Sequence, residues 1–193
     1  MSFFIKNTCF FFFCAFFSIL YADTYTTVRG AYYYPTSSRF REIYSDASIY
    51  ELELDTSVYD DLYAWISYGT LIASGNSTPF GCETELFILP LKLGLKYYLK
   101  GEYLGVYSGL GAVGAYTKIQ NNSSFANQRR TSWDLGGVAK LGAVLYPAHG
   151  MVADLFLDYT YLRAHFSNSR PNVVNLEAEL DGLAAGGALG WNY

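Results

Sequence analysis

Three side chains near the end of the chain have the types and spacing of a hydrolytic site. His165 and Ser167 lie two residues apart, so on a strand both side chains point to the same side. Glu179 follows twelve residues after Ser167, and across a hairpin its parity matches that of Leu183 on the same outer side. A serine beside a histidine that a carboxylate orients is the arrangement of a nucleophile with its general base. The spacing therefore predicts a candidate triad on the outer wall of a sheet.

The same stretch, HFSNSRPNVVNLEAELD, is similar to the His-x-Ser-Asn motif of the lipid A deacylases of the PagL type. That resemblance implies that Ser167 is the nucleophile, His165 the base and Glu179 the group that orients the base. It also implies a position for Asn168 near the oxyanion. An ordinary polar loop contains the same residue types, so the loop interpretation stays open beside the hydrolase.

The remaining candidates for binding are loop cations and a cysteine. The polar segments contain four arginines that could bind lipopolysaccharide phosphates: Arg39, Arg41, Arg129 and Arg130. The alternative is that they are ordinary loop charges in contact with water. Cys82 could crosslink to another envelope protein, and an ordinary lone thiol is the alternative. His149, in PAHG, has no second ligand nearby, and we expect neither a metal nor another cofactor. The net charge is −4 without a basic patch, so nucleic acid is not an expected partner.

The first 22 residues have the layout of a secretory signal peptide. Lys6 is their one cation, an apolar run extends from Cys9 to Leu20, and Ala22 offers a cleavage site. The run has about 12 residues, fewer than the roughly 20 that a transmembrane helix needs. An uncleaved anchor is the alternative. We expect residues 1–22 to be removed, which leaves residues 23–193 as one domain with a single cysteine and no internal disulfide.

Apolar and polar residues alternate through this domain. In FILPLKLGLKYY, residues 87–98, every second residue is apolar, and Lys92, Gly94 and Lys96 lie between them. A period of two predicts strands with two chemically different faces. Eight segments fit this period: 24–35, 48–55, 62–74, 87–98, 104–116, 133–146, 151–162 and 181–193, the third without a clear phase. Long polar connectors (35–47, 75–84, 118–131 and 165–177) alternate with short ones (55–61, 99–102 and 147–150).

Glycines and aromatic residues indicate which face meets water. Glycines share the charged face, as a narrow barrel interior requires, and Tyr and Trp gather on the apolar face near strand ends, as in membrane girdles. A secreted lipocalin-like barrel with the faces reversed is the alternative. We predict an all-β fold, an eight-stranded antiparallel up-and-down transmembrane β-barrel, and expect a bulge at Pro90. Its lumen should hold a network of paired charges: Arg29, Glu51, Glu53, Lys92, Lys96, Asp134, Lys140, Asp154 and Asp158.

The last strand is apolar on alternate positions and finishes in Trp191, Asn192 and Tyr193. Residues 23–193 thereby resemble the small eight-stranded outer-membrane barrels of the OmpA transmembrane-domain, OmpX and OmpW kind. The resemblance implies the outer membrane of a Gram-negative cell, with both termini in the periplasm. It also implies that Trp191 and Tyr193 form the signal for the barrel-assembly machinery, and that outer-membrane lipid and lipopolysaccharide are partners.

This architecture supports several functions. The first expectation is a structural or surface-interaction role, either as an envelope scaffold or in adhesion and host contact through four extracellular loops. The alternatives are a narrow channel for small solutes and the lipid A deacylase described above.

Overall fold

A computed structural model describes residues 23–77, 82–122, 128–147, 150–166 and 176–193, so the predicted signal peptide lies outside the described residues. Strands dominate. The elements are β1 (Thr24–Pro35), α2 (Ser38–Ile43), β2 (Tyr44–Tyr59), β3 (Leu62–Ser77), β4 (Cys82–Lys100), β5 (Leu104–Asn122), β6 (Gln128–Leu145), β7 (Met151–Phe166), β8 (Leu176–Glu179) and β9 (Gly182–Asn192). Within these ranges no helix has the length and apolar character to cross a bilayer.

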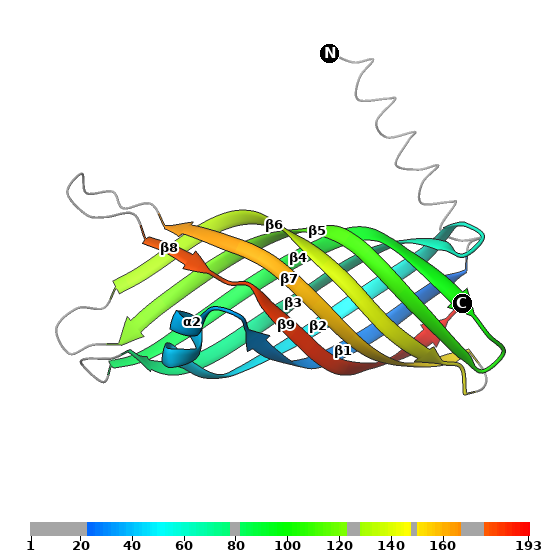
Figure 1. Cartoon of the computed structure of the whole chain (residues 1–193), viewed down its shortest axis with the longest axis horizontal. Helices are drawn as coiled ribbons and strands as arrows, with labels where there is room; N and C mark the ends of the chain where they lie inside the picture. Colours follow the sequence, from blue (N-terminus) through cyan, green and yellow to red (C-terminus); the bar gives the residue numbers. More distant parts are fainter. Residues whose placement is uncertain (1–22, 78–81, 123–127, 148–149, 167–175) are drawn as a thin grey trace, which may run out of the picture.

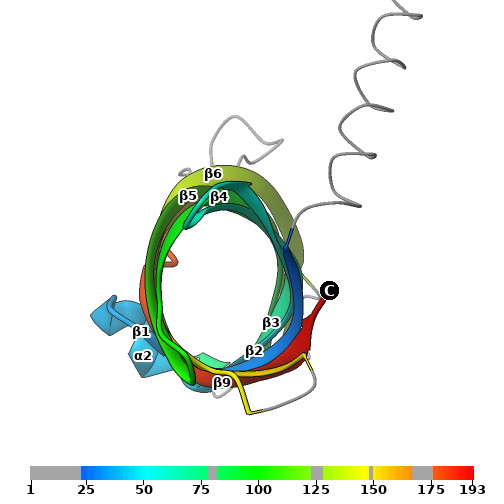
Figure 2. The same cartoon turned by 90° about the vertical axis from the view of Figure 1, so that its right-hand side faces the viewer.

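The strands form one closed, all-antiparallel, up-and-down barrel (Figures 1 and 2). Each strand from β1 to β7 pairs with the next, and β9 pairs with both β7 and β1. The short β8 pairs with β7 in the same register as β9, so β8 and β9 together form the eighth strand of the wall. The predicted fold class is confirmed.

The two ends of the barrel differ. The turn end carries residues 60–61, 101–103, 146–147 and 150, together with Asp23 and Tyr193 (Figure 1). The opposite end, called the loop end here, carries α2, which lies beside the wall (Figures 1 and 2). The first short connector was expected at 55–61, but β2 continues to Tyr59, and the turn is made by Asp60, with a positive φ of 41°, and Asp61. Asp55 is therefore a wall residue.

Strands also extend further toward the loop end than predicted. The connector expected at 118–131 shrinks to 123–127, because β5 and β6 stay paired as far as Asn121 and Gln128. The bulge expected at Pro90 is absent from the described sheet. Pro90 lies opposite Ala115 in a continuous register with β5, and only its ladder to β3 is interrupted. Two pairs, Gly69–Pro90 and Thr70–Leu89, are missing from that ladder, and the register is the same on both sides of the gap. The proline, which has no N–H to donate, is therefore accommodated without an extra residue.

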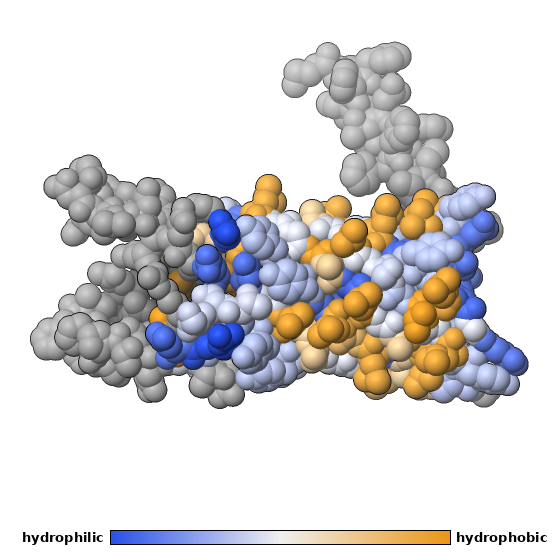
Figure 3. Space-filling view, viewed as in Figure 1, coloured by the Kyte–Doolittle hydropathy of each residue, from blue (hydrophilic) through white to orange (hydrophobic). Residues whose placement is uncertain are grey.

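Exposure of alternate residues identifies the outer face. Lys92 is 2% exposed, whereas its neighbours Leu91 and Leu93 are 44% and 53% exposed. The same alternation covers the wall with an apolar outer belt, part of which appears in Figure 3: Val28, Leu52, Ile66, Leu93, Leu110, Leu141, Leu155 and Leu189. Tyr34, Trp133 and Tyr161 border the belt toward the loop end, and Tyr97 and Trp191 border it toward the turn end. Apolar outside and charged inside is the arrangement of a membrane barrel.

The interior is built in three layers. Toward the loop end lies an apolar cluster with Ile49, Leu71, Leu86, Ile88 and Val113 among its members. Toward the turn end lies an aromatic cluster of Tyr25, Tyr63, Tyr98 and Tyr107 with Val144 and Val152. Buried charges fill the space between them.

Inward glycines make room for the large side chains of these layers. A Cβ on Gly111 would lie 2.7 Å from the Trp65 ring, and a Cβ on Gly142 would lie 2.4 Å from the Tyr107 ring. Real Cβ atoms do not approach neighbours this closely. Glycine at these two positions therefore lets an eight-stranded barrel hold aromatic rings inside it.

Leu155→Arg tests which face meets lipid. Leu155 is 68% exposed near the middle of the belt, so the substitution should lower the free energy of unfolding by about 2–4 kcal/mol. The matched control is Val58→Arg near the turn end, which should lower the free energy of unfolding by only about 0–1 kcal/mol. The measurement is urea unfolding in lipid vesicles. Equal costs for both variants would contradict the membrane belt.

Candidate functional site

The middle layer of the interior is an ion core that draws on six strands. Its members are Arg29 of β1, Glu51, Glu53 and Asp55 of β2, Lys92 and Lys96 of β4, Lys140 of β6, and Asp154 and Asp158 of β7, with Tyr107 of β5. Period-two alternation puts each of these side chains on the inner face of its strand. All are buried, so the charges interact with one another rather than with bulk water.

Glu53 lies at the centre of the ion core. Its Oε2 is 2.6 Å from Arg29 Nη1 and 2.8 Å from Lys140 Nζ, and its Oε1 is 2.6 Å from Lys96 Nζ. Three strands thereby converge on one carboxylate from a fourth. Removing a buried charge that several opposite charges share leaves those charges uncompensated, which is costly.

The other acids extend the ion core on both sides of Glu53. Asp158 accepts from Lys140 at 2.7 Å and lies 3.2 Å from Arg29, while Asp55 lies 2.8 Å from Lys96. Glu51 pairs with Lys92.

Aromatic faces cover three of the four cations of the ion core. The Arg29 guanidinium lies 3.7 Å from the centroid of the Phe156 ring, and Lys140 Nζ lies 4.5 Å from that of Trp65. Lys96 Nζ lies 4.7 Å from the Tyr107 ring centroid. Cation–π contacts of this kind add to the attraction of the carboxylates where water is excluded.

The ion core contains one more acid than base. Four cations (Arg29, Lys92, Lys96, Lys140) face five carboxylates (Glu51, Glu53, Asp55, Asp154, Asp158). The acid outside the ion pairs is Asp154, which accepts a hydrogen bond from the Tyr107 hydroxyl at 2.9 Å. Among the described residues no cation lies within ion-pair distance of Asp154.

The structure brings together every lumen charge that the sequence singled out except Asp134. Asp134 lies nearer the loop end, is only partly buried, and accepts from Ser132 at 2.5 Å. Sequence reasoning missed Asp55, because the predicted strand ended and the predicted connector began at that residue. It also missed Trp65, because the phase of that segment was not clear from its residues. Asp55 could have been found from the sequence, because Glu51, Glu53 and Asp55 are acidic residues at alternate positions.

The candidate triad is only partly within the described residues. His165 lies opposite Glu177 in the β7–β8 ladder, and Glu179 lies opposite Arg163 on the exposed outer face. Ser167 and Asn168 lie outside the described residues. No distance between nucleophile and base follows, so the hydrolase stays a prediction. Among the residues that the structure describes, no group of His, Cys, Asp or Glu is arranged to hold a metal ion.

The other predicted contact residues fall at the ends of the strands. Cys82 is the first residue of β4, opposite Ser77, and Arg129 and Arg130 lie at the start of β6. Arg39 belongs to α2, and His149 lies outside the described residues. Trp191 is exposed on a strand that is hydrogen-bonded on both edges, and Tyr193 continues the pairing through backbone bonds with Thr24.

Two arginines lie against aromatic rings at the loop-end border of the belt. The Arg41 guanidinium lies 5.3 Å from the centroid of the Tyr34 ring and donates to the carbonyls of Pro35 and Thr36 at 3.0 and 3.2 Å. Arg163 lies 5.3 Å from the Tyr161 ring centroid. Both guanidinium groups are exposed beside rings that face outward.

Comparison with known proteins supports the fold. No family model matches the sequence, and no curated protein matches it. The structure is similar to the outer membrane protein OprG of Pseudomonas aeruginosa (TM-score 0.65, 16% identity, 89% of this chain and 96% of that chain). It is also similar to the outer membrane protein W of E. coli (TM-score 0.58, 12% identity, 89% and 98%). A third similar structure is Ail of Yersinia pestis in complex with the heparin analogue sucrose octasulfate (TM-score 0.54, 12% identity, 89% and 97%). The expected likeness to small outer-membrane barrels is confirmed at the level of the fold.

Glu53→Gln should destabilise the barrel more than any exposed carboxylate substitution. The variant keeps the shape of the side chain but removes the charge that Arg29, Lys96 and Lys140 share, so the free energy of unfolding should fall by about 3–5 kcal/mol. Glu85→Gln on the exposed face of β4 is the control and should change it by less than about 0.5 kcal/mol. Urea titration in vesicles measures both. A loss of under about 1 kcal/mol for Glu53→Gln would mean that the ion core does not hold the wall together.

Proposed function

We propose that the protein is an integral outer-membrane barrel of a Gram-negative cell with a structural or surface-interaction role. In this proposal the wall is an anchor, the loop end faces the cell exterior and both termini lie in the periplasm. The apolar belt with aromatic borders supports a membrane location. The fold likeness to outer-membrane proteins supports the choice of membrane.

The observation that carries the proposal is the filled interior. An apolar cluster, the ion core and an aromatic cluster follow one another along the axis. Paired charges at 2.6–2.8 Å have little freedom to move aside for a solute. A filled interior favours activity at the surface over the channel alternative.

The loop-end arginines suggest what that surface contacts. Arg41 and Arg163 are exposed where a membrane barrel meets the phosphates of lipopolysaccharide. Guanidinium groups bind phosphate through two parallel hydrogen bonds, and stacking on Tyr34 and Tyr161 orients them for it. The similar structure Ail was obtained with a sulfated heparin analogue, which is also a polyanion. A polyanion of the outer leaflet, a host or the envelope is the partner class that we infer.

Assembly follows from the same proposal. The outward Trp191 and the terminal Tyr193 lie on the strand that closes the barrel, so we infer that the barrel-assembly machinery recognises them.

Localisation and conductance test the proposal together. The protein should fractionate with the outer membrane and change its gel mobility on heating, because a closed barrel resists detergent until it is boiled. In a planar lipid bilayer the purified chain should show no steady single-channel current. Recovery from the soluble fraction would refute the membrane role. A regular open channel would move the function to the solute-channel alternative.

Arg41→Ala combined with Arg163→Ala should weaken binding of lipopolysaccharide micelles by about tenfold or more, because two charge-assisted contacts are lost. Arg41→Lys with Arg163→Lys is the matched control. It keeps both charges but loses the planar fork, and should fall between wild type and the alanine variant. The measurement is calorimetric titration at two salt concentrations. Equal affinity in all three proteins would exclude these arginines from the contact.

A further inference from the structure

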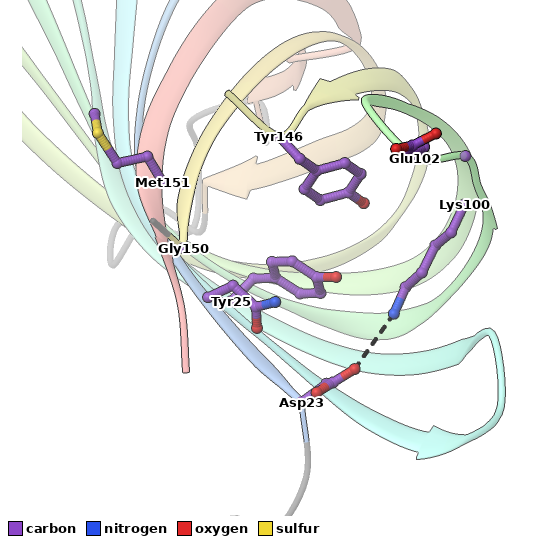
Figure 4. A pocket seen from close by; sticks show the side chains of 9 residues that line it. Asp23, Tyr25, Lys100, Glu102, Tyr146, Gly150 and Met151 are labelled. Carbon is purple, nitrogen blue, oxygen red and sulfur yellow. Dashed lines mark hydrogen bonds and ion pairs between the residues drawn. The ribbon is translucent and has the colours of Figure 1, made fainter. Parts of the chain in front are cut away.

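A pocket of about 400 Å³ opens at the turn end of the barrel, away from the proposed surface contacts (Figure 4). Four parts of the chain meet there: the start of β1, the β4–β5 turn, the β6–β7 turn and the end of β9. The polar and aromatic side chains that line it are Asp23, Tyr25, Lys100, Glu102, Tyr146 and Asn192. Backbone bonds such as Asn192 N to Gly150 O at 2.7 Å and Tyr146 N to Tyr103 O at 3.0 Å hold its walls.

Lys100 shows what kind of group the pocket holds. Its ammonium lies 3.5 Å from Asp23 Oδ2 (Figure 4) and 5.6 Å from the Tyr25 ring centroid. It also donates to the Tyr63 hydroxyl and lies 4.7 Å from the centroid of that ring. A carboxylate with two aromatic faces is the surrounding that alkylammonium ions prefer. The chain thus places one tethered ammonium at the pocket wall.

Other hydrogen-bond acceptors that line the pocket have no cationic partner among the described residues. Glu102 has no ion-pair partner among the described residues, and Asn192 Oδ1 is a buried acceptor without a hydrogen bond there. Burial raises the pKa of the Tyr146 hydroxyl, so this phenol stays neutral and its oxygen can accept. Of the side chains that line the pocket, two are carboxylates, Asp23 and Glu102, and one is a cation, Lys100. Acceptor oxygens and aromatic faces together favour an organic cation over an anion.

We propose that this pocket binds a primary alkylammonium ion, with Glu102 and the Tyr146 hydroxyl at the ammonium and the aromatic faces along its carbon chain. Linear polyamines carry such groups in free form, and phosphatidylethanolamine carries one in its headgroup. With the proposed orientation of the barrel, either source reaches the pocket from the periplasmic side.

Spermidine titration of the purified full chain in a non-ionic detergent tests the proposal. Backbone amide shifts should move at residues 101–103 and 146 and stay constant at the loop end. Glu102→Gln should weaken spermidine binding by about fivefold, and Glu42→Gln, an exposed carboxylate on α2, should not change it. Lys100→Ala should tighten binding, because a second ammonium site then becomes free.

Several outcomes would overturn the proposal. They are an absence of saturable spermidine binding, equal effects of Glu102→Gln and Glu42→Gln, or weaker binding in Lys100→Ala. Binding of inorganic phosphate in place of spermidine would instead make Lys100 part of an anion site and would also refute it. A second arm compares nanodiscs with and without phosphatidylethanolamine, and shift changes there identify the lipid as the source. The heat-dependent gel shift of each variant shows separately whether the barrel itself is intact.

Discussion

A strand that faces hydrocarbon has no water to satisfy its N–H and C=O groups, so a sheet in a membrane must close on itself. The pairing of β9 with both β1 and β7 is that closure. With eight strands the enclosed space is narrow, and every inward residue must either be small or fit against its neighbours. Gly111 beside Trp65 and Gly142 beside Tyr107 meet this requirement. Closure of the sheet therefore explains why the outer face is apolar and why the side chains of the inner face are either small or closely fitting.

The narrow interior also explains the ion core. Side chains from strands that are distant in sequence, such as Arg29 and Asp158, are brought to 3.2 Å because the barrel is small. Buried charges are tolerated only when paired, so Glu53 accepts from three cations where a surface glutamate would need none. A core that is this interdependent leaves the lumen little capacity to change shape. Variation in function is then carried by the two ends of the barrel.

Much of this was accessible from the sequence, since a period of two separates the faces wherever apolar and charged residues alternate, as in Leu91, Lys92 and Leu93. The prediction was weaker where the inner face is itself apolar. Leu71 and Leu86 belong to the apolar layer of the interior, and there hydropathy no longer separates the faces. The bulge at Pro90 was predicted wrongly, because a sequence does not show whether a missing donor interrupts one ladder or adds a residue. Asp134 lies on the same face of its strand as the ion-core residues, but nearer the loop end. The parity of a residue gives its face and does not give its position along the barrel axis.

The loop end shows how the closed wall comes to an end. On the loop-end side of Gly182, the residues before the last strand no longer pair with β1. The chain of β1 turns there toward α2, whereas β8 continues the pairing with β7. Side chains satisfy the backbone at this point: Asp181 Oδ1 accepts from Leu162 N at 2.8 Å, and the Tyr33 hydroxyl donates to the Leu180 carbonyl at 2.5 Å. The Asp181 carbonyl accepts from Thr36 N at 2.9 Å. Polar side chains thus replace ladder bonds where the pairing with β1 ends, so β1 can turn into α2 while β7 and β8 continue the wall as a pair.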